Sequence, residues 1–181
     1  MKRIATKDIY RVWVLQNAAE GQCPVNVYFK GFSIYSFGPD FILGRMVFNE
    51  QNQKAILLTT DGGSASTNRH KVALRDAVKR AHALHFAVPK VTVRDLDHDA
   101  AHRDYRRRVG HMIFKAAHAR IVTSKMMYQN GAEEIQREAN HYAKFFGLKW
   151  ALAITEQLKD RAFLTKVKAQ GGAYLEQLIK L

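Results

Sequence analysis

The sequence has little cysteine or proline and no long apolar run. Among 181 residues there are three prolines and one cysteine, Cys23. A single cysteine excludes an intramolecular disulfide and fits a reducing compartment. No stretch approaches the roughly 18 apolar residues of a membrane-spanning helix. The N-terminal residues alternate apolar and polar positions without a small-residue cleavage site, so no signal peptide is expected. These absences predict a soluble intracellular protein.

Acidic residues are also scarce. The chain has 29 Lys and Arg against 16 Asp and Glu, a formal net charge of +13. Residues 61–128 hold 14 of the basic residues and only 6 of the acidic ones, together with seven of the eight histidines. Such a surplus does not determine a fold, but it favours an anionic partner: nucleic acid, an acidic protein or an anionic membrane surface.

Motifs that would indicate catalysis are missing. Neither the phosphate loop G-x-x-x-x-G-K-[ST] nor the dinucleotide fingerprint G-x-G-x-x-G occurs, and G-x-S-x-G is absent as well. Cys23 has no base near it in the sequence. We therefore assign no catalytic residue and expect no cofactor and no enzymatic activity.

The first third of the chain is predicted to form strands. Short β-branched and aromatic segments are separated by turn residues at regular spacing, which is typical of an antiparallel meander. A tight turn at Lys30-Gly31 predicts a hairpin, and Asn17–Pro24 is expected to be a loop. The five predicted strands are Ile9–Gln16, Val25–Phe29, Phe32–Phe37, Phe41–Phe48 and Lys54–Thr60.

The remainder is mostly helical in pattern. Ser66–His85 places His70, Leu74 and Val78 on one stripe at helical spacing. A short sixth strand is expected within Phe86–Arg94. Further helices are predicted over Ala100–Tyr128, with a stop at Asn130-Gly131, and then over Ala132–Phe146, Trp150–Leu158, Ala162–Ala169 and, after a break at Gly171-Gly172, Tyr174–Leu181.

The expected fold class is therefore α+β. An N-terminal antiparallel sheet of about five strands, packed by a helix, would be followed by a mostly helical C-terminal half. We expect residues 1–95 to form a sheet-plus-helix domain and residues 96–181 to form a helical region packed on it.

The densest run of positive charge is the strongest candidate for a binding site. Tyr105–Lys125 contains no Asp or Glu, so acids within this segment cannot account for its charge. A basic helix face can follow a phosphate backbone, and Tyr105 is a candidate for base stacking. The predicted nucleic-acid contacts are Tyr105, Arg106, Arg107, Arg108, His111, Lys115, His118 and Arg120, with Arg69, Arg75 and Lys79 as a second patch.

The turn before residue 66 is a weaker candidate. A glycine turn that leads into a helix N-terminus presents free N–H groups to an anion. The simpler alternative is that Ser66 or Thr67 caps the helix. The residues of this weak anion-binding site are Gly62, Gly63, Ser64, Ser66 and Thr67.

Two further patterns are open to a structural explanation. His98 and His102 have the i, i+4 spacing of a helical zinc pair, but Asp99 stands where a zincin needs glutamate. We assign no metal ligand and regard a metal-dependent hydrolase as the weakest alternative. The strand aromatics could stack bases on an open sheet face, although such residues more often form the core.

Part of the sequence resembles a known family. The segments FSIYSFGPDFILGRMVF and AILLTTDGGSASTNRHKVALRDAV are similar to a domain of unknown function found in tailed-bacteriophage and mobile-element proteins. The resemblance covers the first half of the chain, and Gly62-Gly63 replaces the Tyr-Ser usual in its turn. It is carried by Tyr35, Ser36, Gly38, Thr59, Thr60, Ser66, Thr67 and His70.

The resemblance implies a phage or mobile-element origin, hence the cytoplasm of a bacterial host, and no established activity. Together with the charge, it predicts a non-catalytic accessory protein that binds DNA or RNA through its basic helix. The alternative is an interaction protein or inhibitor that binds an acidic host protein.

Overall fold

The computed structural model describes residues 1–180, with the backbone alone at residues 154, 155, 159 and 172–180. The chain divides into two compact units, Met1–Asp97 and His98–Leu181, and each is described by itself. Among the residues described, no helix has the length and apolar character needed to span a bilayer.

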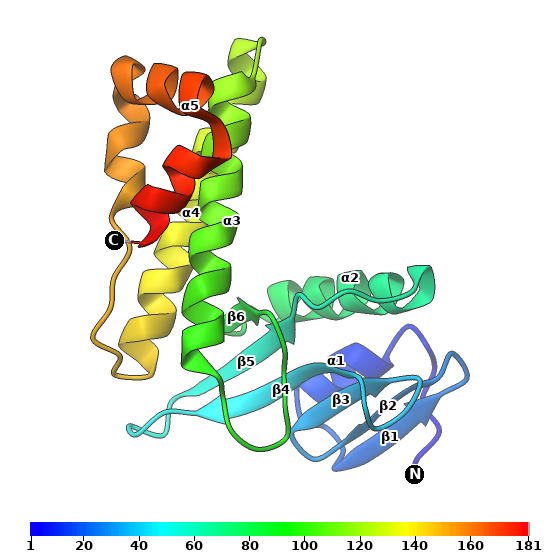
Figure 1. Cartoon of the computed structure of the whole chain (residues 1–181). Coiled ribbons are helices and arrows are strands. Elements are labelled where there is room, and N and C mark those ends of the chain that lie inside the picture. The colour runs from blue at the N-terminus through cyan, green and yellow to red at the C-terminus, as the bar shows by residue number, and fades with distance from the viewer. Residues whose placement is uncertain (181) are drawn as a thin grey trace. The chain divides into compact units, whose positions relative to one another are not determined.

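The first unit is built on a six-stranded sheet (Figure 1). Strands β1 to β5 are antiparallel neighbours in chain order, and β6 returns parallel to β5 after the crossover helix α2, Ala65–Arg80. The predicted α+β class is confirmed, and the sheet is mixed. The strands are β1 Glu20–Cys23, β2 Val27–Lys30, β3 Ser33–Ser36, β4 Ile42–Phe48, β5 Lys54–Thr59 and β6 His85–Val88.

The β2–β3 hairpin forms at the predicted turn. Gly31 has a φ of 54°, a left-handed conformation that glycine adopts without strain. In its register Val27 pairs with Ser36 and Phe29 pairs with Ile34. Because Val27 and Phe29 belong to the buried core, this register turns Ser36 toward the covered face of the sheet.

The prediction of a first strand over Ile9–Gln16 is wrong. Ile9–Val14 is a helix, α1, and the segment expected to be a loop, Asn17–Pro24, contains β1. The β-branched and aromatic residues of Ile9–Val14 favour a strand locally, but Ile9, Tyr10, Trp13 and Val14 are the buried ones. That spacing is helical, so packing decides against local propensity.

One face of the sheet is covered by α1 and α2 (Figure 1). Leu74 and Val78 of α2 are buried against the strands. Gly44 of β4 permits the close approach, because a Cβ there would lie 3.2 Å from Leu74 Cδ2 and 3.0 Å from the Leu57 carbonyl oxygen. The buried cluster comprises Ile9, Tyr10, Trp13, Val14, Cys23, Val27, Phe29, Ile34, Leu43, Met46, Ile56, Leu58, Leu74 and Val78.

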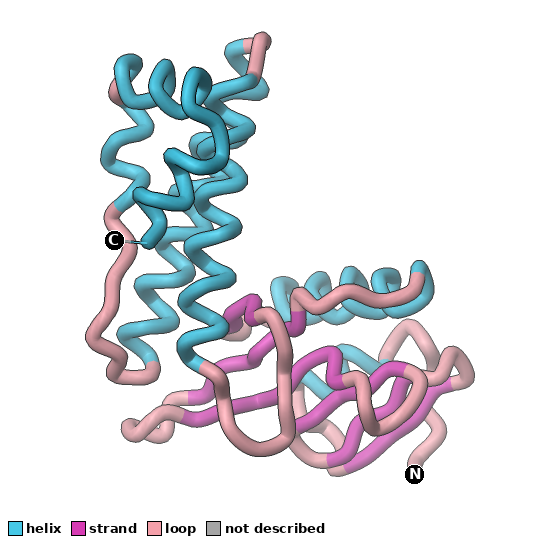
Figure 2. Tube along the Cα trace, in the orientation of Figure 1, coloured by secondary structure: helices cyan, strands magenta, loops and turns pink. Residues whose placement is uncertain are grey.

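The second unit is helical, as predicted, with different boundaries (Figure 2). The helix expected over Ala100–Tyr128 is two helices, and Asn130-Gly131 does not end the second one. The 150s hold a 3-10 helix in place of the predicted α-helix. The elements are α3 His98–His118, α4 Val122–Phe145, η1 Ile154–Lys159 and α5 Arg161–Lys180.

The break between α3 and α4 falls where the sequence has neither Gly nor Pro. Tertiary packing imposes it: α3 and α4 pair through small and apolar side chains of both helices. Gly131 stays helical, and a Cβ there would lie 3.6 Å from Met112 Sδ of α3, an ordinary contact. Gly171 interrupts α5 with a φ of 67°, near the predicted break. The amphipathic character expected for Tyr174–Leu181 falls outside the side chains described.

The α1 assignment gives a first prediction. Trp13 is fully buried, whereas Leu15 at the end of the same helix is 49% exposed. We expect Trp13→Ala to lower the free energy of unfolding of the first unit by about 3–5 kcal/mol, because it leaves a large cavity. Leu15→Ala serves as control and should change it by less than about 1 kcal/mol. Urea denaturation followed by circular dichroism measures both, and equal effects would refute the assigned packing.

Candidate nucleic-acid interface

Four basic side chains lie along the solvent side of α3. Arg103, Arg107, His111 and His118 are all exposed, while the opposite side of the helix is buried. We call these four residues the α3 stripe. It extends about 22 Å, at the helical rise of roughly 1.5 Å per residue. Arg103 was not predicted, because it precedes the acid-free segment; Arg107, His111 and His118 were.

Arg108 has a structural role instead. Its side chain is only 20% exposed, and its Nε lies 2.9 Å from Asp104 Oδ2. Its guanidinium also lies over the Tyr105 ring, 4.5 Å from the centroid, an arrangement typical of a cation–π contact. Arg106, the next predicted contact, is half-buried. The structure therefore places neither residue on the exposed stripe.

An acid just outside the acid-free segment compensates part of its charge. Asp104 lies one residue before the acid-free segment and is itself buried. Its carboxylate pairs with Arg108 and also with Arg107, whose Nη2 lies 2.5 Å from Oδ1. Intrahelical pairs at i+3 and i+4 thus do account for part of the charge. Arg107 nevertheless keeps a side chain that is 75% exposed.

Tyr105 does not face solvent. The ring is completely buried, and its hydroxyl donates a hydrogen bond of 2.9 Å to Glu138 Oε1 of α4. Burial, reinforced by the Glu138 carboxylate, raises the pKa of this phenol. The residue holds α3 against α4, so the predicted base stacking on it is wrong.

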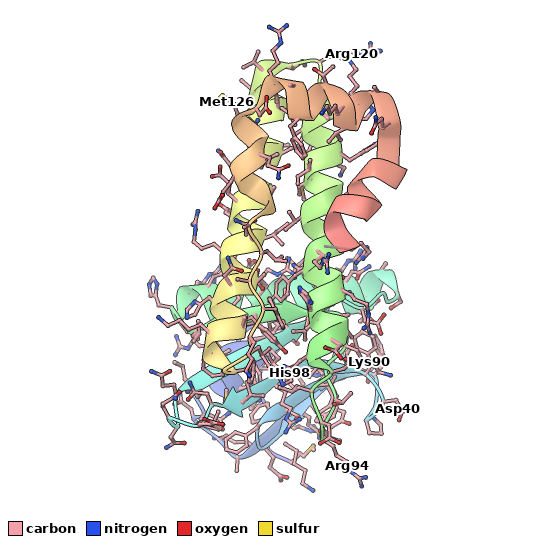
Figure 3. The ribbon with its side chains drawn as sticks, turned by 60° about the vertical axis from the view of Figure 1, so that its left-hand side comes forward. Asp40, Lys90, Arg94, His98, Arg120 and Met126 are labelled. Atoms are coloured by element: carbon pink, nitrogen blue, oxygen red, sulfur yellow. The ribbon has the colours of Figure 1, made fainter. Side chains whose placement is uncertain are left out.

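The end of the α3–α4 hairpin carries the last predicted contacts. Arg120 is exposed, and both it and Met126 lie at the end of the hairpin opposite His98 (Figure 3). Lys115 is half-buried, with its Nζ 5.6 Å from the centroid of the Tyr128 ring. An exposed apolar group occupies the same turn, the apolar tip: Ile121, Val122, Met126 and Met127.

The second predicted patch on α2 is divided between two sides of the helix. Arg69 lines a cavity together with Arg80, whereas Arg75 and Lys79 are exposed and are not part of the lining of that cavity. This cavity lies in the first unit, has a volume of about 790 Å³, and is called the α1–α2 pocket. It is lined by Thr6, Lys7, Tyr10, Arg11, Leu15, Val25, Asn26, Phe37, Ser66, Arg69, His70, Ala73, Asp76, Ala77, Arg80 and Ala81.

The pocket gathers unpaired cations. Lys7 and Arg11 reach it from α1 and the residues before it, and Arg69 and Arg80 from α2; the one acid is Asp76. Among the side chains described, none of these five makes an ion pair. The sequence does not indicate this grouping, because it predicts a strand at Ile9–Gln16 and because residues 7, 37 and 69 meet only in the folded chain.

His70 joins the pocket to the sheet. Its Nδ1 lies 2.8 Å from Ser36 Oγ, and its ring stacks on Phe37 with centroids 5.4 Å apart. Burial lowers the pKa of the imidazole below its ordinary value, so His70 is neutral at pH 7. Ser36 is 1% exposed and cannot reach a substrate, so the pair is not an accessible nucleophile and base.

Backbone N–H groups of the glycine turn donate hydrogen bonds to side chains of the same turn. The Gly62 N–H donates to Asp61 Oδ1 at 2.8 Å, and the Thr67 N–H donates to Ser64 Oγ at 3.2 Å. Ser64 is therefore the N-cap of α2, in place of Ser66 or Thr67. With those N–H groups engaged and Asp61 in the turn, its geometry favours the capping explanation over an anion site.

The two histidines at the start of α3 contact aromatic side chains. His98 Nδ1 lies 2.8 Å from the Tyr142 hydroxyl, and His102 stacks on Trp150 with centroids 4.3 Å apart. Burial first, and then Arg106, lower the pKa of His102. Among the residues described, no three His, Cys, Asp or Glu side chains are grouped as metal ligands would be.

The aromatic residues of the first unit divide between core and surface. Trp13 and Phe29 are buried, whereas Phe32, Phe37 and Phe48 are exposed. Tyr28 and Tyr35 stack on each other with centroids 4.8 Å apart.

Comparison with known proteins adds no relative: no protein-family model matches the sequence, and no curated protein or solved structure gives a significant match.

The environment of His70 gives a second prediction. Because burial lowers its pKa below about 6.5, the unfolded chain binds a proton there at a pH where the folded chain does not. The free energy of unfolding should therefore decrease as pH falls through this window. We expect His70→Asn to make the decrease between about pH 7.5 and 5.5 smaller, as measured by urea denaturation. His82→Asn, at an exposed histidine of the same unit, is the control, and an unchanged pH dependence in His70→Asn would contradict the assignment.

Proposed function

We propose that this chain is a non-catalytic nucleic-acid-binding protein that contacts the phosphate backbone through the α3 stripe and Arg120. One observation carries the proposal: four basic side chains lie on a single solvent face of α3. The acids of α3 are Asp99 at its first turn and Asp104, which is buried and paired. Arg103, His111 and His118 make no ion pair among the described side chains, whereas Arg107 pairs with Asp104 and keeps a side chain that is 75% exposed.

The geometry suits a backbone more than a single anion. Double-stranded nucleic acid carries about one charge per 1.7 Å of axis, so the roughly 22 Å stripe would meet about a dozen charges. Arginine guanidinium groups bind phosphate oxygens with two N–H donors. Contacts of this kind position a protein without reading bases. The expected binding is therefore insensitive to sequence and strongly dependent on salt.

The resemblance to phage and mobile-element domains supports an accessory role of this kind. Two of the positions that carry it, Ser36 and His70, form a buried hydrogen bond, and a third, Ser66, lines the α1–α2 pocket.

The third prediction removes two contacts from the stripe. In the double variant Arg103→Gln, Arg107→Gln we expect weaker binding to every DNA or RNA sequence, and a salt dependence shallower by about two phosphate contacts, close to 1.8 in log–log slope. Gel-shift titrations of single- and double-stranded DNA and RNA at two salt concentrations measure both quantities. The double variant Lys30→Gln, Lys54→Gln, at two exposed cations of the first unit, is the charge-matched control.

Two results would refute the proposal. One is the absence of binding to all four nucleic acids at low salt. The other is binding that Arg103→Gln, Arg107→Gln and Lys30→Gln, Lys54→Gln weaken equally, because net charge and not the α3 stripe would then be responsible.

An acidic protein partner is the second candidate, and the apolar tip favours it. Ile121, Val122 and Met126 are exposed apolar side chains, and exposed Arg120 precedes Ile121 in the chain. Protein interfaces likewise combine apolar residues with arginine. A purified acidic partner should remain bound after nuclease treatment and lose affinity in Ile121→Ser, Met126→Ser. Unchanged affinity in that variant would exclude the tip as the contact.

A further inference from the structure

We infer that the α1–α2 pocket is a binding site for a nucleobase joined to two or more phosphates, either a free nucleoside polyphosphate or a single-stranded segment of nucleic acid. The inference depends only on the first unit and goes beyond backbone binding by the α3 stripe. The pocket volume of about 790 Å³ lies within the range of roughly 300–1,000 Å³ that is usual for small-molecule sites.

The charge of the pocket sets the phosphate content of the ligand. Lys7, Arg11, Arg69 and Arg80 oppose one carboxylate, Asp76. Because none of these five makes an ion pair among the described side chains, their mutual repulsion is left for an anion to relieve. The surplus of positive charge exceeds what one carboxylate ligand would neutralise, so a ligand with more than one phosphate matches it better.

The cations are also spread along the pocket. Arg69 and Arg80 are 11 positions apart in α2, which places them on one face but about 16 Å apart along the helix axis. Ala73 and Ala77 lie between them on the same stripe and line the wall. Their small side chains leave room along the helix. An extended ligand with phosphates at more than one position fits this arrangement better than a compact anion does.

Phe37 supplies the aromatic surface. It is 54% exposed although it lines the pocket, and its ring is backed by the stacked ring of His70. Leu15 and Val25, also exposed, extend the apolar side. A base stacking on an aromatic ring is typical of sites for single-stranded nucleic acid and nucleotides.

The backbone of Phe37 supports a binding role. Its φ of 60° is left-handed, which is uncommon for a bulky residue and costs on its own a measurable part of the stability of the unit. The conformation is held by the Phe37 N–H, which donates to the Asn26 carbonyl oxygen at 2.8 Å. Strain of this kind gathers at ligand sites, and here it presents the ring to the pocket beside His70.

The remaining polar groups complete the recognition. Asp76 supplies a carboxylate acceptor that suits ribose hydroxyls or an exocyclic amine, while Thr6 and Ser66 add hydroxyl groups that can donate or accept. A purely apolar ligand would leave the cations without partners, and an inorganic anion would leave the aromatic side empty. A phosphorylated nucleoside supplies phosphates for the cations and a base for the aromatic side.

The fourth prediction tests the ligand class by isothermal titration of the full chain at low salt. The probes are ADP, GDP, CDP and UDP, titrated separately, with adenosine and inorganic pyrophosphate for comparison. We expect at least one diphosphate to bind, and adenosine and pyrophosphate to bind about tenfold more weakly or worse, because each meets one half of the site. Equal binding of pyrophosphate and the diphosphates would overturn the inference of a base site.

Variants locate the site. Arg69→Gln and Phe37→Asn should each weaken binding about tenfold; asparagine tolerates the left-handed φ at position 37, so the backbone strain is not the variable. Arg75→Gln, at an exposed arginine of the same helix outside the pocket, is the matched control and should bind as the wild type does. Loss in Arg75→Gln equal to that in Arg69→Gln would overturn the location.

A labelled single-stranded oligonucleotide separates the two sources of the ligand. If Arg69→Gln weakens both the diphosphate and the oligonucleotide, the pocket accepts either source; if it weakens the oligonucleotide alone, a strand is the ligand. The variant Arg103→Gln, Arg107→Gln should leave diphosphate affinity unchanged, so failure of the α3 stripe and failure of the pocket are distinguishable. No binding of any diphosphate or oligonucleotide at 1 mM would overturn the inference.

Discussion

The seating of α2 on the sheet is the constraint on which the first unit depends. Leu74 and Val78 are buried over β4 and β5, and Gly44 permits this approach where a Cβ would meet Leu74 and the Leu57 carbonyl oxygen. With this inner side fixed, the adjacent stripe of α2 must face α1 and the end of the β2–β3 hairpin. His70 and Arg69 are carried to that position by the packing of their neighbours. The pocket is thus a consequence of how the core is covered.

A cation held in a buried ion pair has a structural role in this chain, whereas the pocket cations have no ion-pair partner among the described side chains. In the second unit, buried Asp104 holds Arg108 against Tyr105, and Tyr105 in turn bonds to Glu138. Removing such an acid would leave a half-buried guanidinium without its carboxylate, which is costly. In the first unit, Arg69 and Arg80 have no such partner among the described side chains. Arg108, at 20% exposure, is therefore a structural cation, whereas the pocket arginines are available to a ligand.

The sequence predicts the class of the fold well, and its errors have physical causes. Turn chemistry at Gly31 and helical periodicity around Leu74 are local signals, and both elements form as predicted. The helix at Ile9–Val14 opposes its own β propensity, and only the burial of Ile9 and Trp13 in the core decides in its favour. The break after His118 has no local signal at all, because the pairing of α3 with α4 sets where the chain turns back.

The candidate site was harder to predict, and charge counting alone could not have located it. Helical periodicity identifies which cations share a side of α3, but the buried side is fixed by α4, so Arg103 was missed and Tyr105 was misplaced. The pocket needs contacts between residues about 30 to 60 positions apart, such as Phe37 with His70. Counting acids only within Tyr105–Lys125 also omits Asp104, which lies one residue earlier. The charge that matters for binding is therefore the part that remains after each helix has paired its own buried acids, and it lies on Arg103 and the pocket arginines, whereas Arg107 both pairs with Asp104 and stays exposed.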